Sequence, residues 1–218
     1  MNVPVILLGS GGHGRILLEM LQQQSITVLA VVDPRCPVAR IPHNIRLLRD
    51  DKAVLDYPVG QIQLVNGLGS VGDTAKRQQI YEYFKTKGYQ FMTTRHHGAI
   101  ISPEVQMGEG VQVMAGVVIQ IGTMIAANTI INTRAVVEHD CVIGKHVHIA
   151  PGAVLSGGVH VADSVHIGVG ATIIQGVAIG KRTIIGAGAV VVHDIPENVV
   201  AVGVPARIIK SRERDGEG

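Results

Sequence analysis

Three histidines lie within ten positions of one another in the stretch NTRAVVEHDCVIGKHVHIAPG, residues 132–152, among valines and isoleucines. They are His139, His146 and His148, and Asp140 follows the first of them directly. An imidazole titrates close to neutral pH, so it can take a proton from a substrate. A neighbouring carboxylate can set its tautomer and stabilise its charged form. The pair His139–Asp140 is therefore the candidate for general-base chemistry, whereas His146 is predicted to be an ordinary surface residue.

Aliphatic residues recur at every sixth position from Ile101 to Val191, without one break. The positions four residues further on, from Val105 to Ala189, all hold small or β-branched side chains. A period of six fits neither a helix nor a hairpin strand. It is typical of a solenoid in which each hexapeptide forms one short strand and one corner. The sequence therefore predicts a three-sided parallel β-helix with an aliphatic interior and about 18 residues in each coil.

This lattice places the histidines on the outside of the prism. Cys141 falls on an inward position, and His139 and Asp140 do not. His148 follows His139 by nine residues, which is half a coil, so the two imidazoles belong to opposite sides of one prism. They could meet only where two copies of the chain lie side by side. His166, 18 residues after His148, is expected directly above it in the next coil.

The front of the chain begins as a nucleotide-binding α/β unit. A buried strand over Val3–Leu8 leads into the turn GSGGHG, residues 9–14, a helical stretch and a second strand, Thr27–Val32, that ends at Asp33. Glycines let the backbone approach a phosphate, and a helix N-terminus offers N–H donors to it. The acid after the second strand could accept from a ribose or a base. The alternative is a tight turn without a ligand.

The rest of the front segment is short. A third strand is expected over Gln61–Val65, a helix from an Asp73 cap to Lys87, and a last strand over Tyr89–Thr93. About 98 residues precede the repeat, fewer than the roughly 150 of a complete dinucleotide-binding domain. A mononucleotide site is therefore favoured over hydride chemistry.

The hexad lattice resembles the hexapeptide-repeat acyltransferases, which implies a left-handed β-helix. The tail Val199–Lys210, with Gly203-Val204-Pro205-Ala206, resembles the segment that closes such helices. The combination of the GxGGH turn, Asp33 and a C-terminal hexapeptide helix resembles the bacterial nucleotide-sugar acetyltransferases. That group includes UDP-4-amino-sugar and perosamine N-acetyltransferases and sialic acid O-acetyltransferases. We therefore expect an α/β Rossmann-like domain over residues 1–98, a left-handed parallel β-helix over 99–195 and a closing segment over 196–218.

The resemblance also implies roles for particular residues. The nucleotide sugar would lie along Gly11, Gly12, His13 and Asp33, and Asn132 would orient the sugar. The motif NxxAxVxH, matched from Asn132 to His139, implies His139 as general base with Asp140 in support. Acetyl-CoA would be bound by His148, Gly157 and Gly168. The segment Asn66–Ser70 differs from the family's usual GDN, and His96-His97 replaces its usual HP pair, so the base of the nucleotide stays open.

The expected protein is an acetyl-CoA-dependent N-acetyltransferase that acts on the amine of a nucleotide-linked amino sugar. Transfer would be direct, in a homotrimer with active sites between subunits. One alternative is O-acetylation of a sialic acid or similar sugar, and another is a non-catalytic trimeric scaffold that senses a nucleotide. Metal-dependent hydration, as in the γ-class carbonic anhydrases, is disfavoured because the HxxxxH pair of those enzymes is absent from the repeat. No metal is expected.

Composition excludes other classes. A formal charge of +2, carried by scattered Lys and Arg residues, gives no electrostatic footprint for nucleic acid. No apolar run approaches the roughly 18 residues of a membrane span, and the N-terminus lacks the basic lead-in of a signal peptide. The two cysteines show neither metal spacing nor a disulfide framework. These features favour a cytoplasmic protein without membrane insertion.

Overall fold

The computed structural model describes residues 3–212 and divides into two compact units. One unit contains the residues up to Ser70 together with Lys76–Thr94, and the other contains Val71–Ala75 and the residues from Arg95 onward. Residues 213–218 of the predicted closing segment lie outside the described residues. None of the described helices is both long and apolar enough to cross a membrane.

The first unit is built on a four-stranded parallel sheet. Its strands are β1 (Val5–Leu8), β2 (Val28–Val32), β3 (Arg46–Leu48) and β4 (Gln63–Asn66), in the order β3-β2-β1-β4. The helices are α1 (Gly12–Gln23) and α2 (Ala75–Thr86), with short 3₁₀ turns η1 (Val38–Arg40) and η2 (Asp51–Asp56). All four residues of β1 are buried, as expected for a central parallel strand. The Rossmann-like class is thus confirmed.

Two details of this unit differ from the sequence prediction. Strand β3 was not predicted, because its three residues give too short an apolar run. The predicted strand over Tyr89–Thr93 is wrong: apart from one isolated bridge between Leu64 and Phe91, no ladder forms there. Two backbone hydrogen bonds hold the segment beside β4, from the N–H of Leu64 to Gln90 and from the N–H of Met92 to Leu64, and a buried tyrosine adds to them. The hydroxyl of Tyr89 donates to the carbonyls of Val54 (3.0 Å) and Tyr57 (2.7 Å).

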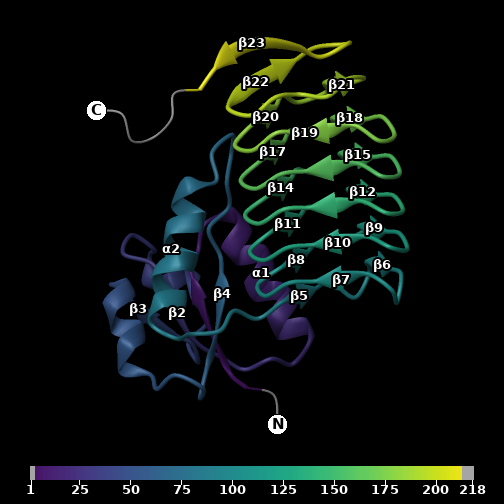
Figure 1. Ribbon diagram of the computed structural model, residues 1–218. Helices are drawn as coiled ribbons and strands as arrows, with labels where there is room; N and C mark the ends of the chain where they lie inside the picture. Colours follow the sequence, from purple (N-terminus) through teal and green to yellow (C-terminus); the bar gives the residue numbers. More distant parts are fainter. Residues whose placement is uncertain (1–2, 213–218) are drawn as a thin grey trace. The chain divides into compact units, whose positions relative to one another are not determined.

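The second unit is a left-handed parallel β-helix stacked in three sheets, with two-residue strands up to β21 and a longer, antiparallel pair, β22 and β23, at its end (Figure 1). The β13 face contains β7 (Gln106–Met107), β10 (Met124–Ile125), β13 (Val142–Ile143), β16 (His160–Val161) and β19 (Ala178–Ile179). The β12 face contains β6 (Ile100–Ile101), β9 (Val118–Ile119), β12 (Val136–Val137), β15 (Val154–Leu155), β18 (Thr172–Ile173) and β21 (Val190–Val191). The β14 face contains β5 (Thr94–Arg95), β8 (Gln112–Val113), β11 (Ile130–Ile131), β14 (His148–Ile149), β17 (His166–Ile167), β20 (Ile184–Ile185), β22 (Val199–Val202) and β23 (Arg207–Ser211).

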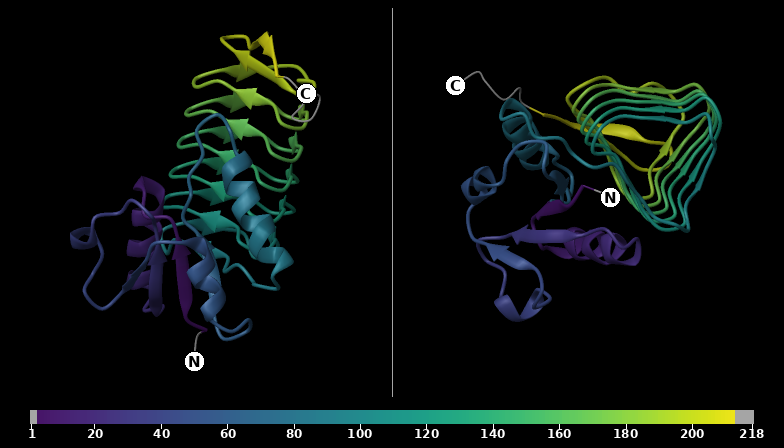
Figure 2. Two further views of the ribbon diagram at one scale, coloured as in Figure 1. Left: turned by 90° about the vertical axis from the view of Figure 1, so that its left-hand side faces the viewer. Right: turned by 90° about the horizontal axis from the view of Figure 1, so that it is seen from below.

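The aliphatic lattice fills the interior of this prism, whose triangular cross-section is visible along its axis (Figure 2, right). Every predicted inward residue from Val113 to Val191 is at most 3% exposed, and Ile101 and Met107 are partly buried beside the same core. Paired residues lie 18 positions apart, as in Val136↔Val154. Inward threonines keep their hydroxyls bonded: Thr123 donates to the carbonyl of Glu138 at 2.9 Å. The predicted register is confirmed.

The corners repeat with the same period. A residue with positive φ occurs at every sixth position from Gly110 to Gly188. Glycine adopts this left-handed conformation without a steric cost, which accounts for many of the 27 glycines. Other residues take the position at Asn128, Arg134, Asp140, His146, Ser164 and Arg182.

Candidate active site

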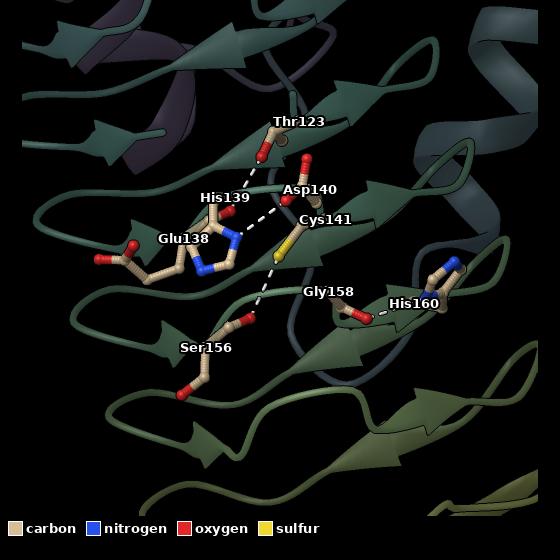
Figure 3. A network of polar contacts seen from close by, with 8 residues as sticks. All are labelled: Thr123, Glu138, His139, Asp140, Cys141, Ser156, Gly158 and His160. Atoms are coloured by element: carbon tan, nitrogen blue, oxygen red, sulfur yellow. Dashed lines mark hydrogen bonds and ion pairs between the residues drawn. The ribbon is translucent and has the colours of Figure 1, made fainter. Parts of the chain in front are cut away.

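His139 and Asp140 form the corner between the β12 and β13 faces, with both side chains outside the prism (Figure 3). The Nδ1 atom of His139 lies 2.9 Å from Oδ2 of Asp140, and the side chains are 53% and 72% exposed. Neighbouring coils hold the corner: the N–H of Asp140 donates to the carbonyl of Ile121, and the N–H of Gly158 to that of His139. The structure therefore brings the predicted pair together at the surface.

This contact indicates which nitrogen of His139 would be available to accept a proton. An ionised carboxylate only accepts hydrogen bonds, so the proton of the neutral imidazole lies on Nδ1. The atom Nε2 then has a lone pair with which to accept a proton from a substrate. A carboxylate on Nδ1 also stabilises the imidazolium that forms when Nε2 is protonated.

Cys141, next in the chain, points into the prism and is fully buried. Its thiol lies 3.3 Å from the carbonyl oxygen of Ser156 (Figure 3). Burial raises the pKa of this thiol, with hydrogen-bonding contacts from neighbouring backbone groups only partly offsetting the effect. A protonated, inward thiol is a poor nucleophile, because the thiolate is the reactive form. The prediction that Cys141 belongs to the core is confirmed.

His148 lies on the β14 face, away from the corner that carries His139, and is only 6% exposed. The Nδ2 atom of Asn132 is 3.0 Å from Nε2 of His148, and the Oδ1 atom of Asn132 accepts from the N–H of Thr133 at 2.8 Å. The oxygen of this amide faces the backbone N–H of Thr133, and its NH₂ group faces the ring. Nε2 of His148 is therefore the acceptor, and the neutral ring carries its proton on Nδ1.

His166 stands directly above His148, as predicted, with the two strands in register. The rings meet edge to face with centroids 5.1 Å apart. His166 is 8% exposed, and burial lowers the pKa of its imidazole. Its Nδ1 has no hydrogen-bond partner within residues 3–212. Over that same range, no three His, Cys, Asp or Glu side chains converge as a metal site would require.

His146 corrects the sequence prediction. It was expected to be an exposed surface residue, but it is 7% exposed. The corner turns its side chain onto the coil below, where Nδ1 lies 2.9 Å from Nδ2 of the buried Asn128. Both residues have positive φ. The hexad rule separates inward from outward positions, but it does not say whether neighbouring side chains in a column cover an outward one.

The glycine turn and Asp33 form a second predicted cluster, in the first unit. The Asp33 carboxylate accepts from the hydroxyl of Ser10 (2.6 Å) and from the N–H groups of Ser10 and Arg35. Partial burial alone would raise the pKa of this carboxyl, but these hydrogen bonds outweigh it and the pKa is lowered. Asp33 thus remains ionised at neutral pH and ties the turn to the end of β2.

Helix α1 starts at this turn without a side-chain cap at Gly11. Gly11 and Gly12 are exposed, and a Cβ added at either would meet nothing within 4 Å, so packing within the chain does not require these glycines. The N-terminus of a helix offers N–H donors to a phosphate. Gly14 has a different purpose, since a Cβ there would collide with the carbonyl oxygen of Gly9. His13, in the first turn of the helix, lies against Gly69. The predicted residues Gly11, Gly12, His13 and Asp33 are therefore gathered at the carboxyl ends of β1 and β2.

A buried arginine holds the loop that follows β4, next to this cluster. No role for it was predicted from the sequence. Arg77 is 2% exposed, and its Nη1 donates to the carbonyls of Asn66 (2.6 Å) and Leu68 (2.8 Å). The amide of Asn66 donates back to the carbonyl of Arg77 at 3.0 Å. Burial lowers the pKa of Arg77 to about 9, which leaves it charged at neutral pH. Arg77 thus braces the segment in which this chain departs from the family's GDN pattern.

A groove of about 620 Å³ lies on the β13 face, one and two coils above the coil of His139. It is lined by His160, Ala162, Ala178, Ile179, Gly180, Asp194, Ile195 and Pro196. None of these residues was predicted from the sequence. Ala162 and Gly180 occupy one column 18 residues apart, but Gly180 gives no signal for a groove, because a Cβ there would collide with the backbone of Pro196 and Glu197.

The two glycines predicted to contact the donor have other neighbours in this structure. A Cβ at Gly168 would lie 2.6 Å from the backbone of Gly186 and Ala187 in the next coil. A Cβ at Gly157 would lie 2.5 Å from Cε1 and Nε2 of His139. Their contacts with acetyl-CoA stay predictions.

Comparison with known proteins identifies both parts of the chain. The family "PglD N-terminal domain" matches residues 4–84, and "Bacterial transferase hexapeptide (six repeats)" matches residues 122–157. GDP-perosamine N-acetyltransferase of Escherichia coli O157:H7 is 36% identical over 88 residues. That match spans only 40% of this chain and 40% of the relative.

Solved structures match over nearly the whole chain. PerB from Caulobacter crescentus, in complex with CoA and GDP-perosamine, is 38% identical with a TM-score of 0.84, over 95% of this chain and 97% of that one. The acetyltransferase domain of PglB from Neisseria gonorrhoeae, in complex with acetyl coenzyme A, is 30% identical with a TM-score of 0.87, over 96% of this chain and 100% of that one. The chain therefore belongs to the bacterial nucleotide-sugar acetyltransferase family, within the hexapeptide-repeat acyltransferases.

Proposed function

We propose that this protein transfers the acetyl group of acetyl-CoA to the amine of a nucleotide-linked amino sugar, with His139 as the general base. The observation that carries the proposal is the exposed pair in which Asp140 holds Nδ1 of His139 at 2.9 Å. This pair leaves Nε2 to accept the proton of an attacking amine. Support also comes from the Caulobacter relative, which binds CoA and GDP-perosamine.

The chemistry follows from the groups present. The sugar nitrogen attacks the thioester carbonyl, and Nε2 of His139 takes the proton that the nitrogen loses. The tetrahedral adduct then collapses with cleavage of the C–S bond. The imidazolium returns the proton to the departing sulfur, so an amide and free CoA result. Because Cys141 is buried and inward, direct transfer is favoured over a covalent acyl-enzyme.

The substrates are assigned to the two parts of the chain that carry suitable groups. Residues 1–98 would bind the nucleotide, with its phosphates at Gly11, Gly12 and His13 and with Asp33 accepting from the ribose or base. The β-helix, residues 99–195 followed by the closing segment 196–218, would bind acetyl-CoA, and the groove on the β13 face is wide enough for part of it. The reaction is accordingly proposed to take place in the cytoplasm.

The active site is proposed to be shared between subunits of a homotrimer. His139 and His148 lie on different sides of one prism, so a second chain is needed to bring one of each together. In its neutral form His148 carries its proton on Nδ1, and this N–H group would donate a hydrogen bond to the oxyanion of the tetrahedral adduct. Asn132 holds that tautomer and is close enough to His148 to orient the sugar as well.

Release of CoA thiol from acetyl-CoA tests the reaction. Purified protein is mixed with acetyl-CoA and GDP-, UDP- or CMP-linked amino sugars, with the matching hydroxy sugars as controls. We expect release with one amino-sugar nucleotide and a loss of 100-fold or more in kcat/KM for His139→Ala, which is typical of a lost general base. Release with a hydroxy sugar only would indicate O-acetylation, and release with none would favour the scaffold.

Mixing inactive chains tests the shared site. His139→Ala and His148→Ala chains are each purified, unfolded and refolded together. Mixed trimers should contain sites with both native histidines and regain part of the activity. Each variant refolded alone is the control, and mixtures that stay inactive would contradict a site between subunits.

A further inference from the structure

Position 157 holds glycine, whereas the equivalent positions in the two coils below it and in the coil above it hold larger side chains. All of them lie at the corner of the pair His139–Asp140, which is called the dyad below. The first turn residue at this corner is Ile121 in one coil, His139 in the next, Gly157 above it and Gln175 above that. The φ of Gly157 lies outside the left-handed region, in contrast to that of Gly158. The backbone at this corner therefore accepts a side chain, so the glycine at 157 has another cause.

That cause is the imidazole of His139. A Cβ placed on Gly157 would lie 2.5 Å from both Cε1 and Nε2 and 3.1 Å from Cδ2. Real Cβ atoms essentially never come this close to a neighbour, and all three of these atoms belong to the one ring. The ring thus occupies the space that any side chain at 157 would fill. Its catalytic edge, the edge that carries Nε2, is the part that lies against the glycine.

The other side of the dyad has a matching glycine. A Cβ on Gly122, one coil below Asp140, would overlap Oδ1 of that carboxylate. Gly122 also has a φ of 73°, so the backbone itself requires glycine there. Gly157 is therefore the cleaner case, since only the ring excludes a side chain.

We infer that Gly157 is a positioning residue: its missing side chain seats the His139 ring so that Nδ1 stays on Asp140 and Nε2 keeps its place beside the glycine. The inference rests on the proposed role of His139. It gives Gly157 a different role from the predicted contact with acetyl-CoA. With alanine at 157 the ring must swing away, and a displacement of about 1 Å at a reacting group can cost about 100-fold in rate.

The first experiment compares Gly157→Ala with Gln175→Ala, a matched control at the same corner one coil higher. We expect Gly157→Ala to lower kcat about 100-fold with little change in KM for acetyl-CoA, and Gln175→Ala to leave kcat within about threefold. A rise in KM for acetyl-CoA with kcat retained would instead show that Gly157 contacts the donor, which would overturn the inference.

The second experiment does not depend on activity. The Cε1–H resonance of His139, identified by its loss in His139→Ala, should shift in Gly157→Ala and stay in place in Gln175→Ala. If His139→Ala proves fully active, the proposed function fails, yet this resonance still decides whether Gly157 seats the ring. An unmoved resonance in Gly157→Ala would overturn the inference.

A stability cycle covers the case in which Gly157→Ala folds poorly. We expect Gly157→Ala to lower the melting temperature of the native chain, and to leave that of His139→Ala unchanged or higher, because the added methyl group then enters empty space. An equal loss in both backgrounds would show that the backbone, and not the ring, requires glycine at 157.

Discussion

Replacing Asp140 with asparagine isolates the charge of the dyad from its geometry. Asp140 has a φ of 58°, and asparagine is one of the few residues that adopt this conformation readily. The Oδ1 of asparagine can still accept from Nδ1 of His139, so the tautomer is kept. What disappears is the attraction between a carboxylate and the imidazolium that forms during the reaction.

The size of the effect follows from exposure. A neutral hydrogen bond contributes about 1 kcal/mol, and a charge-assisted one is roughly twice as strong. Asparagine should therefore lose about 1 kcal/mol of transition-state stabilisation. Since the two side chains are 53% and 72% exposed, solvent screening keeps the loss near this low value. We expect kcat/KM for Asp140→Asn to fall about fivefold, a loss of about 1 kcal/mol.

Asp140→Gly completes the comparison, because glycine stands at the same corner in the neighbouring coils, at Gly122 and Gly158. It removes both the charge and the acceptor without backbone strain, so we expect a loss of about 30-fold, corresponding to about 2 kcal/mol. Thiol release at saturating sugar nucleotide measures all variants, with His139→Ala as the lower limit. Equal activity of Asp140→Gly and the native protein would refute the supporting role of Asp140. A loss for Asp140→Asn as large as for His139→Ala would refute the magnitude argument.

Three further substitutions test other parts of the site. Cys141→Ala should keep kcat within about threefold, because the thiol is buried and protonated, and a complete loss would revive a covalent acyl-enzyme. Asn132→Asp should lower kcat/KM about tenfold or more and move the proton of His148 from Nδ1 to Nε2, visible in ring ¹⁵N shifts, because aspartate cannot donate to that ring. Asp33→Asn should flatten the acid limb of a stability-versus-pH curve. The lowered pKa of Asp33 means that its stabilising contribution is present above the unfolded pKa and is lost as pH falls through the folded pKa. An unchanged acid limb for Asp33→Asn would contradict this reasoning.

The β-helix could be predicted from sequence almost residue by residue, because its rule is local and repeats. Each inward position must be aliphatic and each corner must turn, so one coil predicts the next. The front unit has no such repetition. The three-residue strand β3 gives no periodic signal, and Tyr89 and Phe91 alternate like a strand although their rings pack into the core instead.

Contacts in the site could be predicted where the two side chains are neighbours in the chain. They could not be predicted where the contact joins different coils and its orientation depends on a third residue. Asp140 follows His139 directly, so their contact could be foreseen. The hydrogen bond from Asn132 to His148 joins residues 16 positions apart. Its direction can be assigned only when the N–H of Thr133 is known to donate to the amide oxygen of Asn132. The cover over His146 likewise comes from Asn128, one coil below.

Some of the corners at which glycine is replaced carry polar side-chain contacts. From Gly110 to Gly122 the left-handed corner residue is always glycine, whereas four consecutive corners from Asn128 to His146 have other residues. Each such residue costs roughly 1 kcal/mol relative to glycine. Three of the four offset that cost with a side-chain hydrogen bond: Asn128 and His146 bond each other, and Asp140 bonds His139. Backbone strain of this kind clusters at functional sites. Corners 18 residues apart stack in one column, and the column of Asp140 otherwise holds glycine, at Gly122, Gly158 and Gly176. The aspartate therefore stands out within its own column independently of any motif.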